Sequence, residues 1–250
     1  MTSTRQSVVI TGGAGGIGSA LTRGFLSRGA RVFAADILPK ELDRLREELE
    51  DSSPPNSLST ATFDVSDEAG CQLFASRVRE EWGLVDVLVN CAGYFPFKAF
   101  EEISYADWRT ICAINLDGPF LVTQNLLPLI KKSKAGRIIN ISSGSIFGGN
   151  PDQCHYVAAK AGLIGLTRSL AKVLGRDNIT VNAVTPGLTV TEPVKKMFSK
   201  AALSKVAEAR ALQRDQTAAD LVGAVCFLAS ADAAFITGQI INVDGGSSSH

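Results

Sequence analysis

The sequence predicts an α/β protein with one doubly wound domain, in which helices cover both faces of a seven-stranded parallel sheet. Short runs rich in β-branched residues alternate along the chain with longer segments of helical period. The runs are apolar throughout instead of alternating with polar residues, which is typical of strands buried on both faces. A glycine-rich turn joins the first run to the first helical segment, as in other folds of this class.

The alternation gives the position of each expected element. The strands are expected at 7–11, 31–36, 59–64, 86–90, 137–142, 179–184 and 239–243, of which 59–64 has the weakest pattern. The helices are expected at 16–28, 39–50, 67–82, 104–132, 155–175 and 217–230. The Ser- and Pro-rich stretch 50–59 suits a surface loop better than a domain linker, and no repeat of solenoid length interrupts the pattern. We therefore expect residues 1–250 to form a single domain.

The composition argues against several classes of protein. Hydrophobic residues make up 45% of the chain and charged residues 20%, which allows a substantial core and argues against disorder. The 25 basic residues balance the 25 acidic ones, so the charge favours neither a nucleic-acid partner nor an anionic membrane. No apolar signal segment opens the chain, and no apolar run reaches the ~20 residues that span a bilayer. The five cysteines lack CxxC spacing, so we expect reduced thiols, no metal site and a cytoplasmic location.

The glycine-rich turn has the sequence "TGGAGGIG", residues 11–18. Glycine at positions 12, 16 and 18 allows a tight turn, close approach of the backbone to a pyrophosphate, and packing of the helix on the strand. The N-terminus of the following helix offers unpaired N–H groups and a partial positive charge to phosphates. The turn therefore predicts a dinucleotide site that includes Gly12, Gly16 and Gly18.

Asp36 ends the second expected strand, near the roughly 20-residue distance from the turn that is typical of an acid on the adenosine ribose. Its carboxylate would accept hydrogen bonds from both ribose hydroxyls and repel a 2′-phosphate. Neither Ile37 nor the glycine turn supplies a cation to offset that repulsion, so the sequence favours NAD over NADP. The alternative is an Asp36 that only caps the helix expected at 39–50.

Further motifs follow downstream in a fixed order. They are "NCAG" (90–93), the Asn of "AINLDGPF", "ISS" (141–143), "YVAAK" (156–160), "VNAVTPG" (181–187) and "ITGQIINVDGG" (236–246). With the glycine turn, their spacing resembles the short-chain dehydrogenase/reductase family, in the branch of about this length that lacks a second domain. The resemblance covers practically the whole chain, and two of its segments look like catabolic alcohol dehydrogenases of the family. It implies a Rossmann-type domain that both binds the dinucleotide and carries out the reaction.

The resemblance implies four catalytic residues. Tyr156 would be the general acid/base, and Lys160 its partner one helical turn later, since residues four apart share a face. An adjacent ammonium and the charge of the nicotinamide would lower the phenol pKa, and Lys160 would also hold the nicotinamide ribose. Ser143 would stabilise charge on the substrate oxygen, and Asn115 would hold a water that links Lys160 to solvent. Taken alone, the pair would be a core tyrosine beside a lysine whose charge reaches the surface.

The resemblance also implies binding residues along the whole chain. Those for the cofactor are Gly12, Gly16, Ile17, Gly18, Asp36, Asp64, Val65, Asn90, Ala92, Gly93, Tyr156, Lys160, Pro186, Gly187, Thr189 and Thr191. Those for the substrate are Ser143, Phe95, Phe147, His155 and Phe198, with a lid at about 190–212. The chain departs from the family at Cys91, where a second asparagine is common.

The function that follows is hydride transfer between NAD(H) and a small secondary, aromatic or cyclic alcohol, or its ketone or aldehyde. One alternative is a reductase of carrier-bound 3-oxoacyl groups, with Lys131, Lys132 and Lys134 as a surface for an acidic carrier. Others are a sugar or polyol dehydrogenase and a nucleotide-binding protein without turnover. The resemblance implies a homotetramer, or a dimer, joined through the helices expected at 104–132 and 155–175. No nucleic acid or membrane is expected as a partner.

Overall fold

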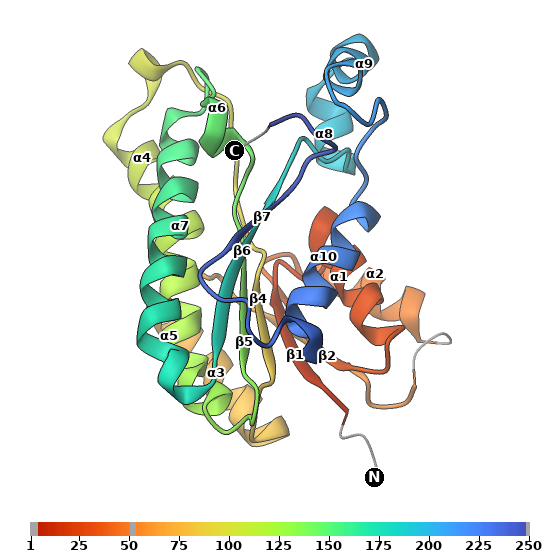
Figure 1. The fold of residues 1–250 in the computed structure, drawn as a ribbon, viewed down its shortest axis with the longest axis vertical. Coiled ribbons are helices and arrows are strands. Elements are labelled where there is room, and N and C mark those ends of the chain that lie inside the picture. Colours follow the sequence, from red (N-terminus) through yellow and green to blue (C-terminus); the bar gives the residue numbers. More distant parts are fainter. Residues whose placement is uncertain (1–4, 51–53, 249–250) are drawn as a thin grey trace.

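The fold of the chain is seen in a computed structural model, which describes residues 5–50 and 54–248 (Figure 1). It contains a seven-stranded sheet in the order β3-β2-β1-β4-β5-β6-β7, and every neighbouring pair is parallel. The predicted fold class is confirmed. The strand order changes direction between β1 and β4, and the loops that leave the carboxyl ends of the strands diverge there, which leaves space for a ligand.

The elements follow the predicted alternation. The strands are β1 (Ser7–Thr11), β2 (Arg31–Asp36), β3 (Leu58–Thr62), β4 (Val87–Asn90), β5 (Arg137–Ile141), β6 (Thr180–Pro186) and β7 (Ile240–Val243). The main helices are α1 (Gly16–Leu26), α2 (Pro39–Leu49), α3 (Glu68–Trp82), α4 (Tyr105–Cys112), α5 (Gly118–Ile130), α7 (Cys154–Leu174) and α10 (Ala219–Ala229). Shorter helices are α6 (Ser145–Gly148), α8 (Glu192–Met197) and α9 (Lys200–Glu208).

The core forms two layers, one on each face of the sheet. Because side chains alternate along a strand, Val8 and Ile10 of β1 enter one layer while Val9 enters the other. Helices α1, α2 and α10 cover the first face, and α3, α5 and α7 cover the second (Figure 1). Burial on both faces explains why the strands are apolar at consecutive positions. Along residues 5–50 and 54–248, no helix is both long and apolar enough to cross a membrane.

The long helix expected at 104–132 is interrupted. Five residues, Ala113–Asp117, form a π-helical segment, η2, between α4 and α5. Within it the side-chain amide of Asn115 donates to the carbonyl of Ile111, 3.0 Å away and four residues back. That carbonyl would otherwise accept a backbone hydrogen bond of a regular α-helix. The backbone N–H of Gly118 bonds instead to Ala113, five residues back.

The segment predicted as a lid contains two short helices, α8 and α9, which stand together above the sheet, on the side of α1 and α2 (Figure 1). Part of the loop expected at 50–59 lies outside the described residues, and β3 ends at Thr62, two residues earlier than predicted.

Candidate active site

The glycine turn lies at the point where the strand order reverses. Gly12 has a φ of +63°, and a Cβ at that position would lie 2.8 Å from the Cα of Ala92. A Cβ at Gly18 would lie 1.9 Å from the carbonyl oxygen of Gly12, so both positions require glycine. Helix α1 begins at Gly16 and has no side-chain cap at its N-terminus. Its first N–H groups therefore suit a diphosphate, and the turn fits a dinucleotide.

Asp36 is the last residue of β2 and is 8% exposed. One carboxylate oxygen accepts from the N–H of Ala14, 3.2 Å away, and the other from the N–H of Leu38, 3.1 Å away. Each oxygen keeps a lone pair that a ribose hydroxyl can reach. The alternative that Asp36 is the cap of α2 is wrong, because the N-cap of that helix is Leu38 and has no side-chain hydrogen bond.

The loops after β3 and β4 carry the next predicted cofactor residues. Asp64 accepts hydrogen bonds from the N–H and the hydroxyl of Ser66, which fixes the turn after β3. Val65 is buried against Gly118, where a Cβ would lie 2.9 Å from its side chain. Beyond β4, the N–H groups of residues 91 and 92 both donate to the hydroxyl of Thr11. Sequence analysis did not assign a role to Thr11, although it is the first residue of the glycine-rich motif.

The side chain of Asn90 is 2% exposed and takes part in a group of buried hydrogen bonds that supports the site. Its amide nitrogen donates to the Thr123 hydroxyl and to the amide oxygen of Asn140, whose own nitrogen donates to Thr167. These contacts tie β4 and β5 to α5 and α7 through buried polar groups, although the amide oxygen of Asn90 itself has no partner among the described residues. Thr123, Asn140 and Thr167 were not predicted, because nothing in the local pattern separates them from other polar residues.

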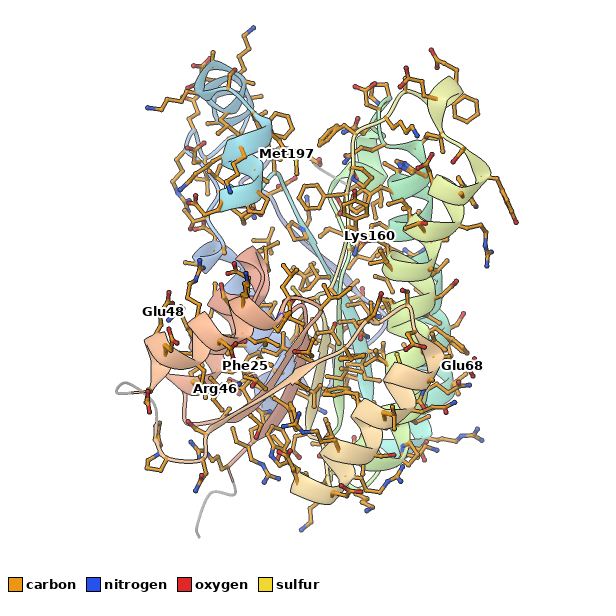
Figure 2. The ribbon with its side chains drawn as sticks, turned by 180° about the vertical axis from the view of Figure 1, so that it is seen from behind. Phe25, Arg46, Glu48, Glu68, Lys160 and Met197 are labelled. Carbon is orange, nitrogen blue, oxygen red and sulfur yellow. The ribbon has the colours of Figure 1, made fainter. Side chains whose placement is uncertain are left out.

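Tyr156 and Lys160 lie one turn apart on α7, as predicted. The Lys160 ammonium is 3% exposed, lies 5.8 Å from the centre of the Tyr156 ring, and donates to the carbonyl of Ile141 at 2.9 Å. Figure 2 shows Lys160 in the space between α7 and the carboxyl end of the sheet. The hydroxyl of Ser142 donates to the main-chain carbonyl of Lys160, so Ser142 faces away from the site, since neighbouring side chains of an extended segment point in opposite directions.

Burial shifts the pKa values of both members of this pair. Burial raises the pKa of Tyr156 to about 12, while the hydrogen bond with Ser143 acts in the opposite direction. Burial also lowers the pKa of Lys160 to about 8. In the protein alone, desolvation therefore outweighs any effect of the ammonium on the phenol. A phenolate near neutral pH needs further positive charge, which an oxidised nicotinamide carries.

Ser143 follows β5 directly and is half-buried. Its hydroxyl oxygen lies 2.9 Å from the hydroxyl oxygen of Ser145 and accepts from the N–H of Ser145 at 3.2 Å. The loop is fixed to β6 because the N–H of Gly144 donates to the carbonyl of Pro186 at 2.8 Å. The hydroxyl that is predicted to bind the substrate oxygen thus lies next to Tyr156 on a well-anchored loop.

Asn115 is completely buried in η2, beside the lysine. Its amide nitrogen also donates to the carbonyl of Tyr94 at 2.9 Å, and its oxygen accepts from the N–H of Tyr94 at 3.3 Å. A Cβ at Gly93 would lie 3.1 Å from this oxygen and 3.5 Å from the Lys160 ammonium nitrogen. The two side chains therefore approach the same point, as a relay from lysine to solvent requires.

The segment after β6 brings the remaining cofactor residues to the glycine turn. The hydroxyl of Thr189 donates to the carbonyl of Gly187 at 3.1 Å. Thr191 packs on Gly16, where a Cβ would lie 2.5 Å from its methyl group. The start of the lid therefore closes over the N-terminus of α1, where the diphosphate is predicted.

Aromatic side chains from two segments meet on the substrate side. The ring of Phe95 lies 6.3 Å from that of Tyr156, and Phe97 packs edge-to-face on Phe198 of the lid at 5.4 Å. Phe147 is half-buried beyond Ser143. In the upper part of Figure 2, Met197 lies on the lid on one side of the molecule and Lys160 lies on the other side.

His155 does not fit its predicted role in this conformation. The side chain has no exposed surface, and neither ring nitrogen has a hydrogen-bond partner among the described residues. Its neighbour Tyr156 faces the site, and residues adjacent on a helix point in directions about 100° apart. A substrate contact would require the start of α7 to move.

The geometry defines a class of protein. A dinucleotide cradle adjoins a tyrosine, a lysine, a serine and an asparagine, and the described residues hold no cluster of three potential metal ligands. This arrangement is suited to proton and hydride transfer with a nicotinamide cofactor.

Comparison with known proteins agrees with this class. A family model described as Enoyl-(Acyl carrier protein) reductase matches residues 12–248. A 3-oxoacyl-(acyl-carrier-protein) reductase of Thermotoga maritima is 38% identical over 95% of this chain and 96% of its own. A meso-2,3-butanediol dehydrogenase of Serratia marcescens is 35% identical over 96% of this chain and 93% of its own. The chain belongs to the short-chain dehydrogenase/reductase family, whose members are oxidoreductases that use nicotinamide cofactors and act on CH–OH groups.

A solved structure supports the same assignment. A short-chain dehydrogenase/reductase of Brucella melitensis, described as glucose/ribitol dehydrogenase, superimposes with a TM-score of 0.92. It is 29% identical, and the alignment covers 98% of this chain and 97% of the other.

A 3alpha-hydroxysteroid dehydrogenase of Mediterraneibacter gnavus is 35% identical over 95% of this chain and 94% of its own. Acyl, diol, sugar and steroid substrates are thus all represented among its relatives.

Proposed function

We propose that the protein oxidises a small secondary, aromatic or cyclic alcohol with NAD, or reduces the corresponding ketone or aldehyde with NADH. The observation that carries the proposal is the convergence of Tyr156, Lys160, Ser143 and Asn115 beside the dinucleotide cradle. In this proposal one domain provides both the cofactor site and the substrate site.

In oxidation, the phenolate of Tyr156 accepts the proton of the substrate hydroxyl, and the bound nicotinamide supplies the hydride acceptor. The Ser143 hydroxyl donates to the same substrate oxygen and stabilises its partial negative charge. Lys160 holds positive charge beside the phenolate, while Asn115 lies where it can hold a water that links Lys160 to solvent. In reduction the same groups act in reverse, with the phenol as the acid.

NAD is the proposed cofactor because Asp36 faces the ribose position with both oxygens free to accept one more hydrogen bond. Replacing Asp36 by alanine together with Ile37→Arg should lower the ratio of kcat/KM for NAD over NADP by about 100-fold or more. The change removes a repulsive carboxylate and adds a phosphate partner at a position that is 56% exposed. Initial rates with each cofactor measure the ratio.

Asp43→Ala is the matched control for the cofactor switch, because Asp43 is an exposed carboxylate on α2 that pairs with Arg46. This variant should keep the NAD preference of the parent. An unchanged preference in the double variant would show that Asp36 does not face the ribose.

The proposed substrate class rests on the aromatic side chains near Tyr156. Phe95 and the pair of Phe97 and Phe198 form an apolar surface of the kind that binds a ring or a short chain beside a secondary alcohol. Phe147 and Met197 lie in the adjoining loop and lid. A compact aromatic surface is less suited to a sugar, whose hydroxyls need polar partners.

A panel of alcohols, read by NADH absorbance at fixed NAD, tests this class. Aromatic and cyclic secondary alcohols should give higher kcat/KM values than sugars, long-chain alcohols or carrier-bound acyl groups. Phe198→Ala should raise KM for the best aromatic alcohol by about 5–30-fold, since one apolar contact in a pocket contributes on this scale. Phe227→Ala is the control, because Phe227 is a half-exposed phenylalanine on α10, outside the site. Preference for sugars, or indifference to Phe198→Ala, would contradict the substrate proposal.

Reduction of carrier-bound 3-oxoacyl groups is the second candidate, favoured by the 38% identity to the Thermotoga maritima reductase. One argument for this candidate was that three lysines form a docking surface for an acidic carrier, and their position does not favour it. Lys131, Lys132 and Lys134 lie between the end of α5 and the start of β5, at the edge of the sheet opposite the site, and Lys131 pairs with Asp177 at 2.8 Å. A carrier docked on them would lie at the opposite end of the strands from Tyr156. An assay with carrier-linked and free ketones separates the two candidates.

The proposed assembly is a cytoplasmic homotetramer, or a dimer, joined through α4, α5 and α7. Two large apolar side chains on these helices support it, since Phe120 is 44% and Val173 is 52% exposed. The mass of the protein in solution decides this proposal.

A further inference from the structure

Ser145, which the sequence did not single out as a site residue, makes two contacts with Ser143. Its backbone N–H donates to the Ser143 hydroxyl oxygen at 3.2 Å, and its own hydroxyl oxygen lies 2.9 Å from the same atom. Both residues are half-buried, and the structure places them on the loop between β5 and α6. Either hydroxyl can be the donor in the second contact, so the direction of this hydrogen bond is set by the other partners of Ser143.

A serine hydroxyl has one hydrogen to donate and two lone pairs with which to accept. One lone pair of Ser143 already accepts from the N–H of Ser145. If Ser143 donated its hydrogen to Ser145, it would have none for the substrate oxygen. If Ser145 donates to Ser143 instead, both lone pairs are filled and the one hydrogen must point elsewhere.

The groups that the Ser143 hydroxyl faces in the site decide which of the two serines is the donor. A ketone oxygen can only accept a hydrogen bond, and so can the phenolate of Tyr156. Ser143 also bonds with the phenol in this structure, where its effect is to lower the Tyr156 pKa. When such an acceptor is present, Ser143 donates its hydrogen to that acceptor. In the contact between the two serine hydroxyls, Ser145 must then be the donor. A hydroxyl that accepts a hydrogen bond becomes a stronger donor itself.

We propose that Ser145 is a positioning residue, which orients the hydrogen of Ser143 towards the substrate oxygen and the phenolate and strengthens that hydrogen bond. The inference rests on the proposed function and adds to it a role for a second hydroxyl, that of Ser145, which donates to the hydroxyl of Ser143. The loop is suited to this role because its backbone is fixed on both sides of Ser143. The hydroxyl of Ser142 donates to the carbonyl of Lys160, and the N–H of Gly144 donates to the carbonyl of Pro186.

Ser145→Ala tests the proposal because it removes the hydroxyl and keeps the backbone N–H. The turnover number for alcohol oxidation should fall about tenfold, the scale of one lost hydrogen bond to a charged group. NADH binding, followed by fluorescence, should stay as in the parent. Ser145→Thr is the matched variant, since it retains a hydroxyl, and it should restore most of the lost turnover.

A pH profile separates a positioning role from a merely structural one. The other titratable groups that face the phenol are Lys160 on the same helix and Cys91 after β4, and Ser145→Ala alters neither. Weaker donation from Ser143 disfavours the phenolate, so the pH at which kcat/KM rises should move upward by about 0.5–1 unit in Ser145→Ala. In Ser145→Thr it should return towards the parent value.

The outcomes distinguish this inference from the proposed function. If Ser145→Ala matches the parent in turnover and pH profile while Tyr156→Phe is inactive, Ser145 does not orient Ser143 and only this inference is overturned. If Ser145→Ala changes only KM for the alcohol, Ser145 contacts the substrate directly and the inference is likewise overturned. If Tyr156→Phe keeps its turnover, the proposed function itself is wrong.

Discussion

Replacing Tyr156 by phenylalanine should lower turnover by about 10²–10⁴-fold, the usual contribution of general acid/base catalysis. The ring is retained, so its packing 6.3 Å from Phe95 and the position of α7 should not change. NADH binding should therefore remain within about twofold of the parent, and kcat and kcat/KM should fall together. Steady-state kinetics of alcohol oxidation and NADH fluorescence measure the two effects. Turnover within tenfold of the parent would refute the assignment of Tyr156.

The same group determines the pH dependence of the reaction. Burial raises the pKa of Tyr156 to about 12 in the protein alone, so the phenol form dominates at neutral pH. Oxidation needs the phenolate, and its population grows as pH rises towards the pKa of the phenol in the cofactor complex. Alcohol oxidation by the parent should thus be favoured at alkaline pH, and ketone reduction at lower pH. A rate of oxidation that falls as pH rises from neutral would contradict the phenolate as base.

Gly18→Ala should weaken NADH binding by about 100-fold or more, equivalent to about 2.7 kcal/mol. The added Cβ would lie 1.9 Å from the carbonyl oxygen of Gly12, so the turn must move away from the position that receives the diphosphate. The free energy of unfolding should also fall, by about 2–4 kcal/mol, because the contact is with backbone and not with a flexible side chain. Fluorescence titration with NADH and thermal unfolding measure both effects.

Gly223→Ala is the matched control for this prediction. Gly223 lies within α10, and a Cβ there meets no atom within 4 Å. The substitution should raise the free energy of unfolding by about 0.5–1 kcal/mol, the ordinary preference of a helix for alanine, and leave NADH binding unchanged. Normal NADH affinity in Gly18→Ala would mean that the turn does not hold the diphosphate.

The sequence was most informative where local pattern and burial agree. The ends of β1 and β2 match the prediction because both strands are buried on both faces, and a glycine of positive φ follows β1. Asp36 and Ser143 come to one edge of the sheet because they stand at, or shortly after, the carboxyl ends of β2 and β5, and Tyr156 joins them from the first turn of α7. In a parallel sheet these ends lie together, so spacing along the chain translates into proximity.

Other features depend on contacts that the pattern does not contain. The break between α4 and α5 coincides with a side-chain hydrogen bond of Asn115, and apolar periodicity does not register such a bond. The phenol pKa was expected to be lowered by Lys160 together with the charge of the nicotinamide, and this stays a prediction; in the protein alone, burial raises that pKa. The contact between Phe97 and Phe198 joins segments about one hundred residues apart, and the burial of His155 depends on how α7 packs. Neither could be derived from local sequence.

The π-helical segment between α4 and α5 has a consequence for insertions and deletions. A π turn holds one residue more than an α turn, so removing one residue from Ala113–Asp117 would allow a single continuous helix. Because the π turn accommodates the additional residue within a single turn, the deletion would leave α4 and α5 in nearly the same relative orientation and would mainly redirect the side chains within Ala113–Asp117. The shortened helix would be more regular, yet the amide of Asn115 could no longer meet both Tyr94 and Ile111. At this position the length of the chain, and not only its residue types, is constrained by the site.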